Sequence, residues 1–266
     1  MARPFLRWAG SKRLMIPHLL NLVPRSYGTY FEPFLGGGAL FLRLAPPSAV
    51  LGDALEPLVN LWRRVADSPE PLVDLANSWA FNKETYNSIR RQPMTSDLAR
   101  AAQFLYLNRG AFSGLWRVNR DGEFNVPWGQ PKTASPLSAS NIRAVSNLLS
   151  RTDLKLDARD FAETTRTAAK GDLVFLDPPY AVSHRSRGFI HYNEKLFAWP
   201  EQERLAGEAQ RLSILGVSVI VANVDHPSVR ELYTGFGEVV IERSSTLAAR
   251  ASGRTSATES LFFANI

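Results

Sequence analysis

The segment best suited to chemistry is Asp177-Pro178-Pro179-Tyr180, which directly follows the apolar run at residues 173–176. Ligands of α/β folds bind at the carboxyl ends of strands. Two successive prolines have a fixed φ and carry no amide hydrogen, so the loop presents carbonyls and a carboxylate without competing N–H groups. Accepting both protons of an exocyclic aromatic amine, at Asp177 and the Pro178 carbonyl, favours a pyramidal nitrogen whose lone pair attacks a methyl group on sulfur. Tyr180 supplies a face on which the base stacks.

A second segment, Glu32-Pro33-Phe34-Leu35-Gly36-Gly37-Gly38, is a glycine-rich turn of the kind that lets a ligand approach the backbone. It does not match the dinucleotide fingerprint, because Gly36 and Gly38 fit but Phe41 occupies the third glycine position. No Gly-Lys-Ser/Thr follows, which excludes a P-loop. Asp53 ends the next apolar run and is placed to accept hydrogen bonds from a ribose diol. These features favour an adenosine cofactor without phosphate, such as S-adenosylmethionine.

The charge of the chain indicates a polyanionic partner. The 266 residues carry 31 Lys and Arg against 25 Asp and Glu, a net charge of +6. The excess gathers in residues 1–30, which contain no acid, in residues 100–143, and at Arg243, Arg250 and Arg254. The aromatic residues Trp8, Phe112, Trp116 and Trp128 lie among these charges, which suits a nucleic acid whose bases also stack. An ordinary solvated charged face is the alternative.

Composition excludes several classes of protein. The chain is 45% hydrophobic and 21% charged, as in globular proteins with a sizeable core. The absence of cysteine excludes disulfide scaffolds, thiolate metal sites and cysteine nucleophiles. Basic residues interrupt every apolar run at the amino terminus and no 18-residue apolar stretch exists, so we expect a cytoplasmic protein. His184 and His191 lie in a polar loop with Arg185 and Arg187, which favours a phosphate contact or a lid over a metal site.

Apolar, β-rich runs alternate with helical patterns, which predicts an α/β fold with a mainly parallel, doubly wound sheet. Seven strands are expected, at residues 29–34, 49–53, 154–158, 173–177, 217–223, 239–243 and 261–264. Helices are expected between them, at residues 12–22, 39–44, 56–65, 201–215 and 227–233.

The interval between the second and third strands is too long for one crossover and predicts an inserted, mainly helical subdomain. Helical patterns cover residues 82–91, 97–108 and 138–149. Residues 115–118 and 123–126 form a hairpin signal around Asn119-Arg120-Asp121-Gly122, where Asp-Gly supplies the positive-φ turn. We therefore expect a catalytic domain of residues 1–55 and 151–266 and a subdomain of residues 56–150.

Motifs along nearly the whole chain carry a family resemblance. They are Phe5-Leu6-Arg7-Trp8-Ala9-Gly10-Ser11-Lys12, the two segments at 32–38 and 177–180, Asn108-Arg109, Gly114-Leu115, Arg117-Val118-Asn119, Gly122-Glu123-Phe124-Asn125-Val126-Pro127 and Arg230-Glu231-Leu232-Tyr233. In number and order these resemble the Dam-type (D12 class) site-specific DNA adenine-N6 methyltransferases. The resemblance implies a seven-stranded S-adenosylmethionine-dependent methyltransferase sheet and an inserted target-recognition subdomain that bears the hairpin.

The resemblance also implies site residues. Catalysis falls to Asp177, Pro178, Pro179 and Tyr180. The cofactor-binding positions are Trp8, Lys12, Phe34, Gly36, Gly38, Asp53, Asp160, Phe161 and Asp177, with Asp160 and Phe161 flanking the cofactor adenine. For Trp8 and Lys12, a packing staple at a helix start is the alternative.

The DNA-binding positions that the family implies are Arg7, Arg109, Phe112, Ser113, Arg117, Asn119 and Pro127. Arg7 and Arg117 are candidates for reading guanine, whose O6 and N7 match the arginine fork, although a phosphate contact is the alternative. Phe112 and Ser113 fall where the family fills the gap left by a flipped base. Three departures stand out: Ser11 replaces a glycine, Ser113 an asparagine, and Gln130-Pro131 the Arg-Tyr of GATC-specific members.

These observations predict transfer of a methyl group from S-adenosylmethionine to adenine N6 in duplex DNA, at GATC or a GA-containing relative, after base flipping and without metal. Methylation of cytosine N4, of RNA or of a protein amide remains open. A nicotinamide-dependent oxidoreductase is disfavoured by Phe41, and a noncatalytic DNA-binding module leaves the glycine turn unexplained. We expect a monomer that does not bind membranes, with or without a cognate restriction enzyme acting separately.

Overall fold

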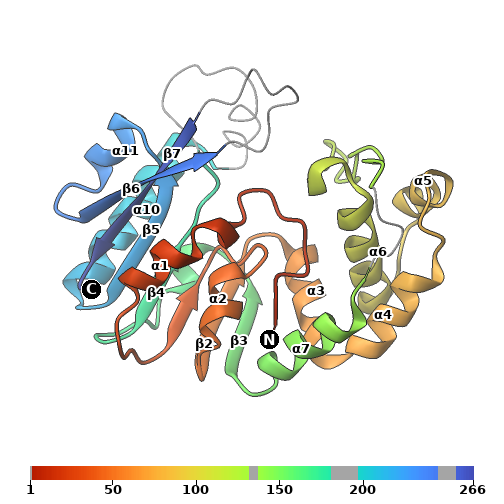
Figure 1. Cartoon of the computed structure of the whole chain (residues 1–266), viewed down its shortest axis with the longest axis horizontal. Helices are drawn as coiled ribbons and strands as arrows, with labels where there is room; N and C mark the ends of the chain where they lie inside the picture. Colours follow the sequence, from red (N-terminus) through yellow and green to blue (C-terminus); the bar gives the residue numbers. More distant parts are fainter. Residues whose placement is uncertain (1, 132–136, 181–196, 245–255) are drawn as a thin grey trace. The chain divides into compact units, whose positions relative to one another are not determined.

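A computed structural model describes residues 2–131, 137–180, 197–244 and 256–266 (Figure 1). The expected polar loop with His184, Arg185, Arg187 and His191 lies outside these residues, as do Arg250 and Arg254. The chain divides into two units, which we describe separately. Unit 1 comprises Met1–Leu19 and Leu35–Arg159, and unit 2 comprises Leu20–Phe34 and Asp160–Ile266. The expected assignment of residues 56–150 to DNA recognition concerns function rather than packing, and it stays a prediction.

All seven expected strands are present in one sheet with the order β3-β2-β1-β4-β5-β7-β6. They are β1 (Tyr30–Glu32), β2 (Ser48–Asp53), β3 (Asp153–Ala158), β4 (Leu173–Leu176), β5 (Ser218–Val224), β6 (Gly237–Ser244) and β7 (Ser256–Ala264). The pairs β2–β3, β1–β4 and β4–β5 are parallel, whereas β7 runs antiparallel to β5 and β6. This confirms the expected α/β class with a mainly parallel sheet.

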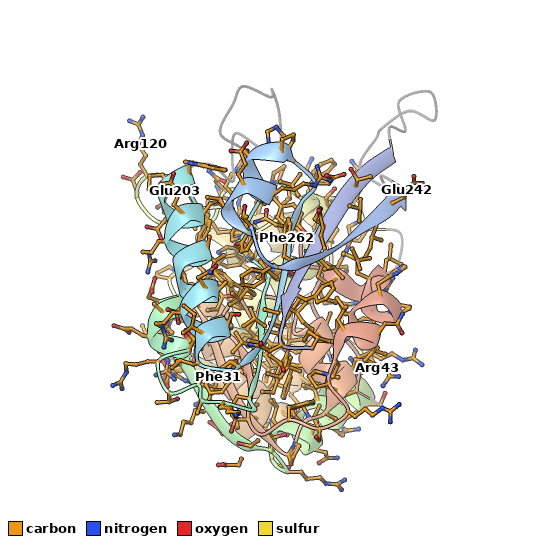
Figure 2. All side chains as sticks on the ribbon, turned by 90° about the vertical axis from the view of Figure 1, so that its left-hand side faces the viewer. Phe31, Arg43, Arg120, Glu203, Glu242 and Phe262 are labelled. Atoms are coloured by element: carbon orange, nitrogen blue, oxygen red, sulfur yellow. The ribbon has the colours of Figure 1, made fainter. Side chains whose placement is uncertain are left out.

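Unit 2 is built on the buried strands β4 and β5. Every residue of β4 is buried, as are all but the last of β5, which is typical of strands covered on both faces. Helix α10 (Trp199–Ile214) packs against β5 and buries Gln202, Leu205, Ala206, Ala209 and Leu212, at the spacing of one helix face. Phe31 of β1 and Phe262 of β7 lie in the interior (Figure 2). Unit 2 also contains the short α8 (Phe161–Thr164), which was not expected, and α11 (Pro227–Leu232).

Unit 1 gathers helices around α6 (Asp97–Gly110), which packs against α3 (Glu56–Asp67), α4 (Pro69–Ser78) and α5 (Lys83–Arg91). Unit 1 also contains β2 and β3, the helices α2 (Ala39–Leu44) and α7 (Ala139–Leu149), and the 3₁₀ turns η1 (Lys12–Leu14) and η2 (Phe112–Gly114). Buried residues occur on all sides of α6, as expected of a helix surrounded by others. Helix α4 was not predicted from the sequence. It begins at Pro69, directly after the Ser68 cap of α3, because proline favours the first position of a helix.

Two sequence predictions need correction. The helix expected at residues 12–22 is divided into η1 and α1 (Ile16–Leu22). Pro17 explains the division, because proline lacks an amide hydrogen and is tolerated only in the first turn of a helix.

The expected hairpin lacks regular strands. The backbone does fold back, with Asn119 N donating to Glu123 O at 2.8 Å, but the only ladder contact within it is an isolated bridge between Val118 and Phe124. Of the Asp121-Gly122 pair only Gly122 has a positive φ, of 80°. Gly122 therefore supplies the expected positive φ, and the correction concerns the flanking strands alone.

Replacing Gly38 by alanine should destabilise the protein. Gly38 has φ +59, and a Cβ there would lie 2.8 Å from Cη2 of buried Trp62. The left-handed conformation alone costs alanine about 1–2 kcal/mol, and the clash adds to this, so we expect the free energy of unfolding to fall by about 2 kcal/mol or more. Urea denaturation measures it. Gly207→Ala is the control. Gly207 lies in the middle of α10 with open space around it, so the alanine variant should have a free energy of unfolding about 0.5–1 kcal/mol higher than the wild type. Equal stability of Gly38→Ala and the wild type would contradict this packing.

Candidate active site

Side chains of unit 2 hold the loop after β4 at two points. The Pro179 carbonyl accepts a hydrogen bond from Nε2 of Gln202 at 3.2 Å. The Tyr180 hydroxyl donates to Oε2 of Glu259 at 2.6 Å. Both partners are buried, on α10 and β7 respectively. The sequence analysis missed Gln202 and Glu259, because a polar residue within an otherwise ordinary helix or strand gives no signal of the loop it contacts.

The carboxyl end of β1 adds a buried tyrosine–carboxylate pair. Strands β1 and β4 are adjacent and parallel, with Tyr30 opposite Leu173. The Tyr30 hydroxyl donates to Oε2 of Glu32 at 2.8 Å. Burial raises the pKa of Tyr30 well above its ordinary value, and the charges of Glu32 and Asp177 raise it further. Tyr30 therefore stays protonated and serves as a donor in a region rich in acceptors.

Asp160 and Phe161 begin helix α8 and both contact Arg204 of α10. Asp160 caps the helix by accepting from Ala162 N at 2.9 Å. The Arg204 guanidinium donates to both Asp160 oxygens, at 2.9 and 2.6 Å, and lies 3.9 Å from the centre of the Phe161 ring. Hydrogen bonds from Arg204 hold the pKa of Asp160 below its usual value. Arg204 was not predicted, since its contact with Asp160 joins residues far apart in the sequence.

Phe34 and Phe161, both expected at the cofactor, pack against each other. Their ring centres are 5.6 Å apart with an interplanar angle of 28°. Phe197 completes this cluster, edge-on to Phe34 at 5.6 Å and tilted against Phe161 at 6.1 Å. The cluster provides an apolar surface beside the Asp160 carboxylate, which suits a flat aromatic ligand with polar edges.

In unit 1, Asp53 ties the glycine turn to the end of β2. Its two carboxylate oxygens accept from the backbone N–H groups of Gly36 and Leu55, both at 3.0 Å. Burial raises the pKa of Asp53, while these two hydrogen bonds oppose the rise. An ionised carboxylate has about four acceptor sites. Asp53 can therefore hold the turn and still accept from a diol, so the residue fits the ribose of an adenosine cofactor.

Trp8 packs on the glycine turn and begins a row of aromatic rings. A Cβ on Gly36 would lie 2.7 Å from the Trp8 indole nitrogen, so this contact requires glycine. Trp8 stacks on Phe104 of α6 at 6.2 Å, and Phe104 stacks on Trp116 at 3.8 Å. Trp116 in turn meets Phe124 at 4.6 Å. The row runs from the glycine turn to the loop that was expected to bind DNA.

Two further amino-terminal residues of the expected site are held by polar contacts. Lys12 is buried, and its ammonium donates to the Gly10 carbonyl at 2.9 Å. The backbone of Arg7 is bracketed by the Asn108 side chain, which accepts from Arg7 N at 3.0 Å and donates to Arg7 O at 2.9 Å. The Arg7 guanidinium is exposed and donates to the Arg109 carbonyl at 3.3 Å. Burial, with Arg7 nearby, lowers the pKa of Arg109.

The other expected DNA-binding residues lie on one loop, residues 112–127. Phe112 is 56% exposed and Ser113 has φ 54. Arg117 and Pro127 are also exposed, and Arg120 projects from this loop (Figure 2). Nε of Arg117 donates to Oδ1 of Asn125 at 2.7 Å, which supports the guanidinium from its inner side.

Asn119 shapes the tip of this loop. Its side-chain oxygen accepts from the N–H groups of Asp121 and Glu123, at 3.0 and 2.8 Å, and its amide nitrogen donates to the Glu123 carboxylate at 2.9 Å. The side chain therefore holds the turn together, a role that the sequence analysis did not assign to it.

Within the described residues, no three or more His, Asp and Glu side chains come together as a metal site would require. Over the same residues, no helix combines the length and the apolar character needed to cross a membrane.

Comparison with known proteins identifies related sequences. A family model described as D12 class N6 adenine-specific DNA methyltransferase matches residues 8–247. The chain is 37% identical to "Type II methyltransferase M1.LlaDCHI" of Lactococcus lactis subsp. cremoris, over 97% of this chain and 93% of that protein. It is 30% identical to a "DNA adenine methylase" of Vibrio cholerae, over 97% and 95% of the two chains. It is also 30% identical to the "Retron Ec67 DNA adenine methylase" of Escherichia coli, over 96% and 88%.

Replacing Arg204 by glutamine should cost stability in a pH-dependent way. The Arg204 and Asp160 side chains are 43% and 40% exposed, so we expect a fall of about 1 kcal/mol or less at pH 7. Because Arg204 lowers the folded-state pKa of Asp160, this stabilisation is present above about pH 3.9, the pKa of unfolded Asp. It is lost as pH falls through the lowered folded pKa. Urea denaturation at pH 7 and pH 3 measures the change.

The control is a double-mutant cycle with Asp160→Asn, which keeps the helix cap. If the ion pair is the cause, the double variant loses less than the sum of the single losses. Additive losses, or a loss that is the same at both pH values, would contradict the assignment.

Proposed function

The chain belongs to the D12 class of N6 adenine-specific DNA methyltransferases, and on that premise we propose that it transfers the methyl group of S-adenosylmethionine to an adenine flipped out of a short duplex site. Membership makes it a DNA adenine methyltransferase, which excludes the oxidoreductase and noncatalytic alternatives. The observation that carries the proposal is the donor-poor loop at the end of β4, held by buried side chains.

In this proposal the loop Asp177-Pro178-Pro179-Tyr180 binds the target base. Asp177 and the Pro178 carbonyl accept the two N6 protons, which withdraws the nitrogen lone pair from the ring and directs it outward. Asp177 carries negative charge opposite the nitrogen that becomes positive as the N–CH3 bond forms, so it stabilises the transition state more than the ground state. The S–CH3 bond of the donor would break at the same time, S-adenosylhomocysteine would leave, and the surplus N6 proton would pass to Asp177 and on to solvent. Tyr180 stacks on the base and compensates for part of the energy lost on unstacking from the duplex.

S-adenosylmethionine supplies a methyl group on a positively charged sulfur, which makes a metal unnecessary. We assign its ribose hydroxyls to Asp53 and its adenine to Asp160 and Phe161, with Phe34 in the same cluster. Gly36, Gly38, Trp8 and Lys12 are assigned to the remainder of the cofactor. Asp53 supports this most directly, because it holds the turn with only part of its acceptor capacity.

For DNA, we assign entry into the gap left by the flipped base to Phe112 and Ser113. The exposure of Phe112 supports this, since its 56% exposed ring is accessible to a base pair. We assign the reading of bases to Arg7 and Arg117. The DNA-binding surface is completed by the other expected positions, Arg109, Asn119 and Pro127. The proposed target is GATC or a GA-containing relative. The proposed recognition subdomain comprises residues 56–150. Gln130, with φ 49, departs from the GATC-specific pattern.

Asp177→Ala should abolish methyl transfer while the protein still folds. Plasmid DNA from a methylation-free host that expresses the wild type or the variant would be mapped for modified bases by long-read sequencing. We expect N6-methyladenine at one short motif for the wild type and none for Asp177→Ala. Glu242→Ala, an exposed change on β6, is the control and should retain activity. Methylation by a folded Asp177→Ala variant would eliminate the proposed role of the loop, and a folded wild type that modified no base would eliminate duplex DNA as substrate.

Phe112→Ala should weaken methylation of paired adenine more than of unpaired adenine. Without the ring, the cost of opening the base pair is no longer compensated, so we expect kcat/KM on matched duplex to fall about tenfold, equivalent to ~1.4 kcal/mol. The fall should be smaller when the target adenine faces a mismatch, because that pair is already weak. Val118→Ala, another exposed apolar residue of the loop, should not discriminate. An equal loss on matched and mismatched DNA would show that Phe112 has no part in base flipping.

A further inference from the structure

We propose that Gln202 is a positioning residue of the methyl-transfer reaction, acting through Pro179 on the base-binding loop, and that Asn223 fixes the direction in which Gln202 donates. This inference rests on the proposed function of the loop at residues 177–180. It concerns residues of α10 and β5 that contact neither base nor cofactor in that proposal. All contacts in the argument lie within unit 2.

The two prolines deprive the loop of backbone donors, and Gln202 compensates for their loss. A loop after a strand is ordinarily held by its own amide N–H groups, but Pro178 and Pro179 have none. At these two positions the backbone can be held by hydrogen bonds to its carbonyl oxygens only. The Pro179 carbonyl is tied to Gln202 at 3.2 Å, and the Tyr180 hydroxyl is tied to Glu259 at 2.6 Å.

A backbone group sets the direction of the Gln202 contact. The N–H of Val224 can only donate, and it donates to Oδ1 of Asn223 at 2.8 Å. The Asn223 amide nitrogen therefore faces the other way and donates to Oε1 of Gln202 at 2.9 Å. With its oxygen engaged, Gln202 presents Nε2 to Pro179. The chain of donors runs in one direction, from the β5 backbone to the loop carbonyl.

Burial makes this arrangement specific. Gln202 and Asn223 have no solvent exposure, and the other buried residues of α10 are apolar. A buried amide without partners costs about 1–3 kcal/mol, so each side chain needs all the contacts described above. Gln202 and Asn223 are shielded from solvent, and the hydrogen bond from Gln202 restricts the direction of the Pro179 carbonyl.

The hydrogen bond between Tyr180 and Glu259 also anchors the loop to the carboxyl end of β5. Glu259 of β7 lies opposite Val224 in the antiparallel β5–β7 pair. Both contacts therefore connect the loop to the carboxyl end of β5, one through Gln202 and Asn223 and the other through Glu259. The two anchored positions, Pro179 and Tyr180, directly follow Pro178.

This anchoring bears on the acceptor that the reaction uses. A residue that precedes proline is restricted to extended conformations, which applies to Asp177 and Pro178. The ring of Pro179 fixes its φ, so its ψ alone separates the directions of the Pro178 and Pro179 carbonyls. Holding the Pro179 carbonyl on Gln202 therefore limits the directions in which the Pro178 carbonyl can meet the N6 amino group. In this inference Gln202 positions the Pro178 carbonyl through its neighbour.

The test compares Gln202→Met with the wild type. Methionine has a similar length and suits the apolar face of α10, so it removes the amide with little change in packing. Misplacing a reacting group by about 1 Å costs up to ~100-fold in rate, so we expect kcat for methyl transfer to an oligonucleotide duplex to fall about 10- to 100-fold. KM for DNA and the affinity for S-adenosylhomocysteine by calorimetry should change little, whereas the melting temperature should fall because the buried Asn223 amide loses its acceptor. Gln210→Met, at an exposed position of the same helix, should change none of these.

Two companion variants sharpen the result. Gln202→Glu keeps the shape but places an acceptor against the Pro179 carbonyl, so we expect kcat to fall at least as far as in Gln202→Met. Asn223→Leu removes the group that sets the direction, and combined with Gln202→Met it should lower kcat no further than Gln202→Met alone.

Unchanged kcat in Gln202→Met would overturn the inference, as would a variant that does not fold or that loses kcat and cofactor affinity together. If the folded wild type transfers no methyl group, the proposed function fails instead, before any variant is compared.

Discussion

Two consecutive prolines at the end of β4 impose the constraint on which the rest of unit 2 depends. They make the loop rich in acceptors, which suits an amino group as ligand, but they also remove the amides that would normally hold a loop in place. Side chains from α10 and β7 instead hold the loop at the Pro179 carbonyl and the Tyr180 hydroxyl. The loop thus explains why Gln202, Asn223 and Glu259 are buried polar residues.

Unit 1 solves a similar problem at the glycine turn. Asp53 holds the turn through two backbone N–H groups, and Trp8 packs so closely on Gly36 that no side chain fits there. The same Trp8 begins the row of rings that ends at Phe124. Trp8, which is assigned to the cofactor, is therefore connected by ring packing to Phe124 in the loop that carries residues assigned to DNA. In both units a polar contact fixes the backbone and aromatic rings fill the space around it.

The strands and most helices were predictable because their signals are local. Apolar runs such as residues 173–176 and caps such as Asn82 before α5 mark elements within a few residues of themselves. Errors arose where neighbouring signals compete. Pro17 divides a continuous helical pattern, and Asn119 shapes its turn by side-chain hydrogen bonds that the Asp-Gly pattern does not reveal.

The sequence by itself determined the chemistry of the site: an acceptor loop after a strand, a glycine turn, a strand-end acid, and the order of motifs that identifies the family. These features are continuous in the chain, so residue type and spacing suffice to find them. Only the tertiary structure decided what holds them. Gln202 reaches Pro179, Glu259 reaches Tyr180 and Arg204 reaches Asp160 across long stretches of chain. Such contacts depend on how α10, β5 and β7 pack, and packing brings together residues that share no local pattern.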